Sequence, residues 1–302
     1  MVAQGSAAIC APIIRTICHP EAGEARLKDL RIRGLRRRPL DDRLMIRLSY
    51  NPPYDWDGIL NFLRPRAIAG VEVVNDFYER DGVRVTHDPA NHALIVNSEP
   101  DRVRKMFDVD ADILAIEKLF KRDKTLGPLI RKHRGIRVPG TWDPFEMAIR
   151  AMVGQQISVA GATTIMARIA SRHGVTPKSL MRARTNPGMP QARWNAIRGL
   201  ARAVTRGEVT FERGATLDES IAKLTALPGI GPWTAEIFLL YELHRPDAFP
   251  AWEIGLRKAL AALDGLDSPP SADAAVARAE GWRPYRSYAA GHLWRSLPPN
   301  RG

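Results

Sequence analysis

The stretch LPGIGPWTAE, residues 227–236, combines two glycines, a proline and a tryptophan where a helix is expected to begin. Pro232 suits the first turn of a helix, because an N–H at that position would have no helical partner. Glycine adopts backbone angles that a side chain forbids, and it lets another surface come close. The unpaired N–H groups at a helix N-terminus can bind an anion. The stretch therefore predicts either an anion-binding hairpin or a simple corner between two helices.

The charge of the chain favours the anion-binding interpretation. The sequence has 45 Lys and Arg against 33 Asp and Glu, a formal net charge of +12 and a pI of about 10.1. Such a balance attracts polyanions, and nucleic acid is the first candidate. A basic proteome, a ribosome or an acidic membrane surface would account for the same charge. The expected anion is a DNA phosphate, which positions a protein without reading sequence.

Length and composition indicate a water-soluble protein. The 302 residues are 45% hydrophobic and 26% charged, enough for two or three packed units. No apolar run reaches the length of a membrane span, and no basic segment precedes the apolar patch Ala7–Ile14, so a secretory signal is not expected. The two cysteines, Cys10 and Cys18, exclude a disulfide scaffold and a cysteine cage for a metal. A reducing, cytoplasmic location is the expectation.

Shifts in composition divide the chain into three parts. Residues 1–44 contain the charge run RIRGLRRRPLDDR and are expected to form a basic, disordered arm. Residues 45–109 have β-branched runs separated by Asp-Gly and Pro-Ala-Asn turns, which predicts an antiparallel sheet with one or two helices. Helical patterns dominate residues 110–302. The predicted fold class is therefore α+β and mainly α.

Helix signals place LPGIGPWTAE between two helices. Thr216 is followed three residues later by Glu219, a capping box that predicts the start of a helix. The second helix is expected to begin at Pro232, so that the whole hairpin spans residues 217–243. Further helices are expected over residues 252–297.

Five segments of the chain together resemble one protein family. LPGIGPWTA is similar to the helix-hairpin-helix of the base-excision DNA glycosylases. The segments YNPPYDWDGILNFLRPRAIAGVE, VPGTWDPFEMAIRAMVGQQISVAGA, DAFPAWEIGLRKAL and WRPYRSYAAGHLW resemble 3-methyladenine DNA glycosylase II, in the same order. The resemblance covers roughly residues 45–295. It implies an α/β domain of TATA-binding-protein-like shape at 45–109. A helix-hairpin-helix glycosylase core of two helical subdomains follows, with the active-site cleft between them.

The resemblance implies an enzyme that flips a damaged base out of duplex DNA and hydrolyses its N-glycosidic bond. Relatives that also cut the DNA backbone have a lysine in the hairpin, where this chain has Trp233, so no lyase step is expected. Aromatic faces suit a cationic alkylated base. Trp233 and Trp294 match the aromatic residues of the family's base pocket, and Trp252, Tyr285 and Tyr288 are further candidates. Packing in the core is the alternative role for each.

The resemblance also implies contacts with DNA. Gln155 and Gln156 lie in GQQIS, which matches the family's loop that enters the gap left by the flipped base. A hydrogen bond across a helix start is the alternative role for both glutamines. Gly229, Gly231 and Thr234 are the expected DNA-binding residues of the hairpin.

The expected ligands follow from the same resemblance. The backbone carbonyls of Thr225, Leu227 and Ile230 match positions where the family holds a monovalent cation, Na⁺ or K⁺. No cofactor is expected to be required, and the four clustered cysteines of the iron–sulfur branch are absent from the sequence. The expected partner is double-stranded DNA that contains a damaged base. The protein is expected to act as a monomer without a membrane partner.

The chain departs from the family pattern at the catalytic position. The family has an aspartate after the Phe-Pro pair, where it stabilises the developing oxocarbenium ion and orients water. This chain reads FPAWEIGL, which places Glu253 at the aspartate position and Trp252 before it. Glutamate keeps the charge but moves the carboxylate outward by one methylene, about 1.5 Å. A displacement of about 1 Å can reduce a rate about a hundredfold.

This departure leaves three hypotheses open. The first is an active glycosylase for alkylated purines that uses Glu253. The second is a DNA-binding paralogue with weak or no excision, which the Trp252–Glu253 pair favours. The third is a glycosylase that acts on another lesion, such as hypoxanthine. Pocket shape decides the preferred lesion, and the sequence does not define that shape.

Overall fold

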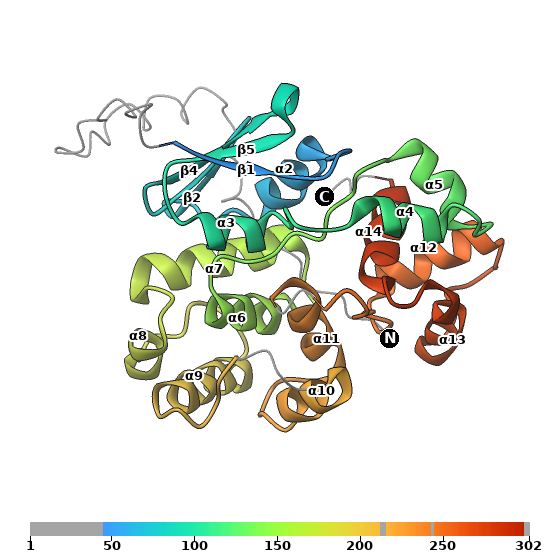
Figure 1. Cartoon of the computed structure of the whole chain (residues 1–302). Helices are drawn as coiled ribbons and strands as arrows, with labels where there is room; N and C mark the ends of the chain where they lie inside the picture. The colour runs from blue at the N-terminus through green and yellow to red at the C-terminus, as the bar shows by residue number, and fades with distance from the viewer. Residues whose placement is uncertain (1–44, 212–215, 243–244, 299–302) are drawn as a thin grey trace, which may run out of the picture. The chain divides into compact units, whose positions relative to one another are not determined.

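The computed structural model of the chain describes residues 45–211, 216–242 and 245–298. The predicted basic arm at residues 1–44 lies outside these ranges, and so do Cys10 and Cys18. The labels of helices and strands below are those of Figure 1.

In the described part of the chain, a five-stranded antiparallel sheet has the strand order β1-β5-β4-β3-β2 (Figure 1). The strands are β1 (Ile46–Ser49), β2 (Glu72–Val74), β3 (Tyr78–Arg80), β4 (Val83–Asp88) and β5 (Ala93–Val96). Asp81 and Gly82, between β3 and β4, have φ angles of 51° and 79°, as a tight hairpin turn requires. The predicted antiparallel sheet is therefore confirmed.

Two helices pack against this sheet and bury an apolar face on it. They are α2 (Trp56–Leu63) and α3 (Pro100–Met106). α2 begins where the Asp55 side chain accepts a hydrogen bond from the Gly58 N–H, at 2.9 Å. The helical spacing of apolar residues on α2 places them in one cluster with residues of the strands and of α3. The buried residues of α2 are Trp56, Ile59, Leu60 and Leu63.

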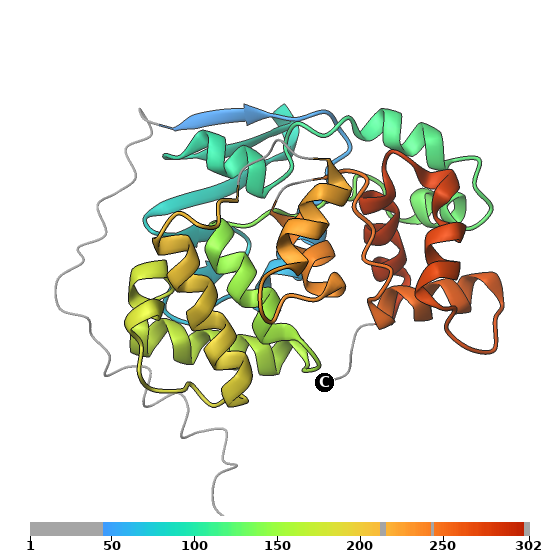
Figure 2. The same ribbon diagram turned by 90° about the horizontal axis from the view of Figure 1, so that it is seen from below.

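The other helices form two groups that share one hydrophobic core. The first group contains α6 (Pro144–Gly154), α7 (Val159–His173), α8 (Pro177–Arg182), α9 (Gln191–Thr205), α10 (Leu217–Thr225) and α11 (Pro232–Tyr241). The second contains α4 (Ile113–Phe120), α5 (Leu126–Lys132), α12 (Ile254–Asp264), α13 (Ala272–Arg278) and α14 (Arg286–Ser296). Figure 2 shows the first group in green to orange and α12–α14 in red. The predicted core of two helical subdomains is confirmed.

Local signals explain where the helices of the predicted hairpin begin. Thr216 accepts from the Glu219 N–H at 3.3 Å, and Glu219 accepts from the Thr216 N–H at 3.1 Å, so the predicted capping box is confirmed. α11 begins at Pro232, as predicted. Among the described residues, we find no helix whose length and apolar character would let it cross a membrane.

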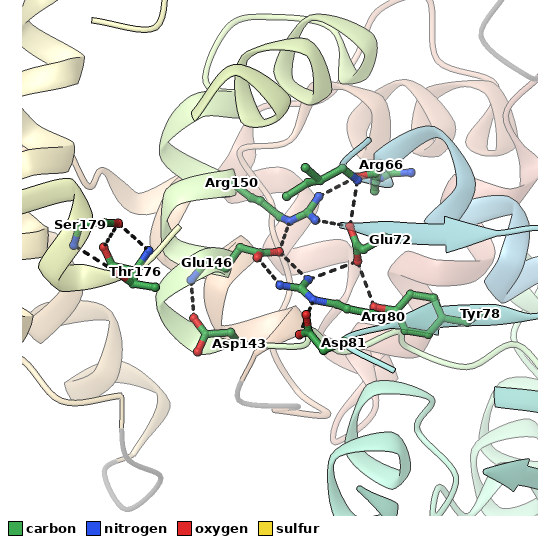
Figure 3. A network of polar contacts seen from close by, with 11 residues as sticks. Arg66, Glu72, Tyr78, Arg80, Asp81, Asp143, Glu146, Arg150, Thr176 and Ser179 are labelled. Atoms are coloured by element: carbon green, nitrogen blue, oxygen red, sulfur yellow. Dashed lines mark hydrogen bonds and ion pairs between the residues drawn. The ribbon is translucent and has the colours of Figure 1, made fainter. Parts of the chain in front are cut away.

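A buried network of ion pairs joins the sheet to α6 (Figure 3). Arg80 of β3 donates two hydrogen bonds to Glu146 of α6, at 3.0 and 2.6 Å. Arg150, one turn further along α6, donates to Glu146 at 2.9 Å and to Glu72 of β2 at 2.7 Å. Tyr78 donates to Glu72 at 3.0 Å. The network thus pairs charged side chains of α6 with those of β2 and β3, which lie far from α6 in the sequence.

Electrostatics keeps Glu146 charged within this network. Burial alone would raise the pKa of Glu146, but hydrogen bonds from Arg80 and the charges of Arg80 and Arg150 hold that pKa below its ordinary value. The network fixes α6, whose C-terminal end leads directly into the turn at Gln155 and Gln156. The sheet thereby sets the position of a turn that the sequence assigns to DNA contact.

Candidate active site

Glu253 is the N-cap residue of α12, and its carboxylate is held by two donors. Its Oε2 atom accepts a hydrogen bond from the Leu256 N–H at 2.5 Å. The same oxygen accepts a hydrogen bond from the indole Nε1–H of Trp294, on α14, at 2.9 Å. The side chain is half-buried. The structure thus brings together two predicted site residues, Glu253 and Trp294, although 41 positions separate them.

Trp294 also lines a cavity of about 220 Å³ with two other aromatic side chains. Tyr241 of α11 lies parallel to Trp294, with ring centroids 6.3 Å apart and an interplanar angle of 21°. Phe62 of α2 packs against Tyr241 with centroids 5.2 Å apart. The wall is completed by polar and apolar residues that include Asp55, Ile59, Asn61, Arg137 and Val138. The cavity therefore has aromatic faces, and Trp294 connects it to the carboxylate of Glu253.

Sequence reasoning did not identify Phe62 and Tyr241 as site residues. Phe62 lies within a segment of the family resemblance and Tyr241 lies in the second helix of the hairpin, but their apolar helical spacing is also that of a core residue. Burial raises the pKa of Tyr241, and the negative charge of Glu253 raises this pKa further. The positive charge of Arg66 acts in the opposite direction. The Tyr241 hydroxyl is therefore neutral at physiological pH. Tyr241 is identified as a site residue by its proximity to Glu253 in the folded structure, which the sequence does not show.

The structure places the other predicted pocket aromatics outside the lining of this cavity. Tyr288 is buried and donates a hydrogen bond to Asp108 at 2.9 Å. Tyr285 meets Tyr288 edge to face, at a centroid distance of 6.3 Å. Trp233 is half-buried against the core and faces Gly154. Trp252 is 53% exposed, so its ring does not fill the cavity.

A half-buried acid, Glu236 of α11, lies against the loop that leads to Glu253. Burial raises the pKa of Glu236 to about 7, and the backbone N–H groups of Trp252 and Ala251 and the charge of Arg286 act against this rise. Its Oε2 atom is buried and has no hydrogen-bond partner. Asp247, the other acid of this loop region, accepts from Arg286 at 2.8 Å and is engaged by Arg283 as well. Glu253 is thus the acid of this region that contacts Trp294.

The hairpin turn needs a glycine at position 229. Gly229 has a φ angle of 84°, and a Cβ there would lie 2.6 Å from the Ala196 Cβ of α9 and 3.1 Å from the Met152 Cε of α6. Gln155 fixes the turn from the other side, because its Nε2 donates to the Gly229 carbonyl at 2.9 Å. It also donates to the Thr234 hydroxyl at 2.7 Å. Thr234 is buried, so its side chain serves the hairpin internally.

Gly231 and Gln156 lie on the open side of the same region. Gly231 is the exposed N-cap residue of α11, and a Cβ there would meet open space. The N-terminus of α11 is therefore accessible to an anion. Gln156 is exposed and has a φ angle of 61°, and the next residue, Ile157, is also exposed. The structure thus places Gln155 in contact with the hairpin, and the DNA contacts of Gln155 and Gln156 stay a prediction.

The hairpin turn also contains the three carbonyls that the resemblance assigns to a cation. The Leu227 carbonyl accepts a hydrogen bond from the Ile230 N–H at 3.1 Å, which closes the turn. Carbonyl oxygens are hard donors and fit Na⁺ or K⁺ better than a transition metal. Within residues 45–211, 216–242 and 245–298, no group of three His, Cys, Asp or Glu side chains could hold a metal ion.

One long segment of the first helical group has no acidic residue. Between Glu146 and Glu208 the sequence contains neither Asp nor Glu. Its exposed cations are Arg168, Arg172, Lys178, Arg182, Arg184, Arg202 and Arg206. We call residues 147–207 the acid-free segment. It comprises most of α6 and the whole of α7, α8 and α9, and α9 contacts the hairpin through Ala196.

Comparison with known proteins agrees with this architecture. Residues 45–143 match the family model described as the AlkA N-terminal domain. A Mycobacterium tuberculosis protein described as a probable bifunctional transcriptional activator/DNA repair enzyme AlkA is 34% identical over 83% of this chain. The chain spans only 57% of that relative's length. DNA-3-methyladenine glycosylase 2 of Escherichia coli is 31% identical, over 83% of this chain and 96% of the relative.

Solved structures share the fold. A 3-methyladenine DNA glycosylase from Archaeoglobus fulgidus superposes with a TM-score of 0.71 at 20% identity, over 82% of this chain and 97% of that one. The Schizosaccharomyces pombe 3-methyladenine DNA glycosylase Mag1, in complex with abasic DNA, gives a TM-score of 0.55 at 26% identity. That match covers 60% of this chain and 95% of the other. On the strength of the E. coli relative, which is matched over nearly its whole length, the chain belongs to the family of the DNA-3-methyladenine glycosylases.

Proposed function

We propose that this protein is a monofunctional DNA glycosylase that removes alkylated purines from duplex DNA. The observation that carries the proposal is the contact between the Glu253 carboxylate and Trp294, a wall of the aromatic cavity. The name of the E. coli relative, DNA-3-methyladenine glycosylase 2, points to the same substrate class. The damaged base would be flipped out of the duplex and enter this cavity.

The geometry suits a leaving base that carries a positive charge. Alkylation of a purine ring nitrogen makes the base cationic, and the faces of Trp294 and Tyr241 attract such a cation. The guanidinium of Arg66 already lies over the ring of Phe62, at 3.9 Å. The Glu253 carboxylate supplies negative potential for the oxocarbenium ion that develops on the sugar, and it orients the attacking water. The Leu256 N–H and the Trp294 indole fix this carboxylate before the reaction, so no reorganisation is needed during it. Bond cleavage then yields the free base and an abasic sugar.

A DNA-binding protein without excision activity is the alternative. The Trp252–Glu253 pair favours that hypothesis, and Trp252 would exclude the base if its ring filled the cavity. Trp252 is 53% exposed and is not part of the cavity wall, so the observation that favoured the alternative is weakened. Glycosylase activity is therefore the function that the geometry supports better.

The first expected result concerns the product. Wild-type protein should release 7-methylguanine from a duplex that contains one such base and leave the DNA strand intact. The reason is that Trp233 occupies the position where lyase relatives have their lysine, so this position offers no amine for a Schiff base. Release is measured by chromatography of the free base, and strand integrity by denaturing gels without alkali. Efficient trapping of a protein–DNA adduct with borohydride would contradict the monofunctional assignment.

We further propose that DNA is held by the hairpin together with the acid-free segment. The accessible N-terminus of α11 can bind one DNA phosphate. The exposed cations of the acid-free segment can bind the phosphates on either side of it. The carbonyls of Thr225, Leu227 and Ile230 would hold a monovalent cation beside the same phosphate. A cation there would bridge the turn to the DNA backbone.

The second expected result is therefore a change in DNA affinity. Gly229→Val should weaken binding to undamaged duplex at least about tenfold, because its side chain would collide with Ala196. Arg202→Gln should lower the salt slope of log K by about 1 if Arg202 contacts a phosphate. Both are measured by fluorescence anisotropy between about 50 and 200 mM KCl, and again with tetramethylammonium to test the cation.

Two matched variants serve as controls for this measurement. Gly82→Val introduces the same backbone strain, because Gly82 also has a positive φ angle. It lies in the β3–β4 turn, where a Cβ would meet open space. Lys118→Gln removes an exposed cation of α4 outside the acid-free segment. If Gly229→Val binds as well as Gly82→Val, the hairpin is not part of the interface. If Arg202→Gln and Lys118→Gln have the same salt slope, α9 does not contact the phosphates.

A further inference from the structure

The backbone conformation at position 255, in helix α12, does not require a glycine. It is the second residue of α12, and its φ angle is not in the left-handed region. Alanine and most other residues form a helix more readily than glycine does, so local propensity would select another residue. The explanation for this glycine must therefore lie in the space around it.

That space is filled by the carboxylate of Glu253. A Cβ at position 255 would lie 2.9 Å from Oε2, 3.2 Å from Oε1 and 3.4 Å from Cδ of Glu253. These are its three nearest contacts, and all belong to one side chain. The extra methylene of glutamate makes it fold back over the first turn of α12, where Oε2 reaches the Leu256 N–H. An aspartate cap reaches the same N–H without this detour.

We propose that Gly255 is a positioning residue that makes a glutamate usable at the catalytic position. This inference rests on the proposed glycosylase function. A methyl group at position 255 would lie closer to Oε2 of Glu253 than Cβ atoms lie to their neighbours in real structures. The carboxylate would therefore have to move. The carboxylate is the far end of a flexible side chain, so it can shift at little cost. This shift would lengthen the hydrogen bonds to Leu256 and Trp294 and would move the negative charge away from Trp294. Glu253 and Gly255 therefore act as a matched pair.

The test is a double-mutant cycle on the full-length chain with a duplex that contains one 7-methylguanine. Gly255→Ala should reduce the single-turnover excision rate about 10- to 100-fold, while DNA affinity stays the same. The thermal midpoint should change little, because the helix propensity that alanine adds offsets the weakened N-cap hydrogen bond. In the Glu253→Asp background, which should retain excision, Gly255→Ala should change the rate less than about twofold. Gly281→Ala adds a Cβ that would meet open space near α13, and it should leave the rate unchanged.

A second measurement tests the pairing of Glu253 with Gly255 without an activity assay. The indole N–H resonance of Trp294 in ¹H–¹⁵N spectra reports the hydrogen bond to Glu253. It should shift upfield in Gly255→Ala and stay in place in Gly281→Ala. An unmoved resonance in Gly255→Ala, or equal rate losses in the wild-type and Glu253→Asp backgrounds, would overturn the positioning role. Absence of excision by wild type, with the expected shift, would overturn the proposed function and leave the positioning role supported.

Discussion

Glu253→Gln should lower the single-turnover rate of 7-methylguanine excision by about 10²–10³-fold or more, while duplex affinity changes less than about twofold. The amide keeps the size of the side chain but removes the negative charge that stabilises the sugar cation, and losses of this order follow the removal of one preorganised electrostatic contact. The rate is measured with enzyme in excess, so that only the chemical step is followed. Affinity is measured on the same duplex by anisotropy.

Two further substrates and one further variant refine this expectation. Cationic lesions such as 3-methyladenine should be excised, whereas neutral hypoxanthine should be a poor substrate, because a neutral leaving base needs protonation. Glu253→Asp should excise as fast as wild type or faster. If Glu253→Gln excises as fast as wild type, another group supplies the charge. If wild type binds normally and excises nothing, the DNA-binding paralogue is the better description.

The largest expected effect on stability concerns Glu146. Glu146→Gln should lower the free energy of unfolding by about 3–5 kcal/mol, because Arg80 and Arg150 then share the Glu72 carboxylate alone and one positive charge of the network is uncompensated. Urea denaturation at pH 7, followed by far-ultraviolet circular dichroism, measures the change. The pKa of Glu146 is lowered in the folded protein, so its contribution is present above pH 4.5 and is lost as the pH falls through the folded-state pKa. The difference between variant and wild type should therefore narrow at acid pH.

Glu79→Gln provides a control of the same chemistry at the surface. Glu79 pairs with Arg84 at 3.4 Å, and both side chains are well exposed, at 43% and 31%. Solvent screens such a pair, so its loss should cost less than about 1 kcal/mol. Equal effects of the two variants would mean that the buried network adds no more stability than a surface pair.

Local signals in the sequence predicted the elements of the fold well. The Thr216 capping box and Pro232 gave the starts of two helices, and the Asp-Gly turn gave the β3–β4 hairpin, because each depends on neighbouring residues alone. The five segments of family resemblance gave the order of the domains. The boundary at residue 109 and the assignments of individual site residues stay predictions.

The composition of the cavity wall could not be read from the sequence in the same way. Phe62 and Tyr241 meet Trp294 only through tertiary packing, and in sequence they resemble ordinary core residues. The carboxylate of Glu253 occupies the space that a Cβ at position 255 would need, and only the folded structure shows this proximity. Tyr288 donates a hydrogen bond to Asp108 and does not line this cavity, a tertiary contact that the sequence does not show.

The cavity wall has a consequence for how the protein acquires its activity during synthesis. Phe62 lies near the beginning of the described chain, Tyr241 lies in the hairpin and Trp294 lies in the last helix, α14. Chains emerge from the ribosome from the N-terminus, at about 5–20 residues per second, and contacts of long sequence separation form late. The hairpin is therefore exposed to the cell before α14 exists. Under the proposed function, a nascent chain therefore completes its catalytic site only after α14 is made, when the indole of Trp294 reaches the carboxylate of Glu253.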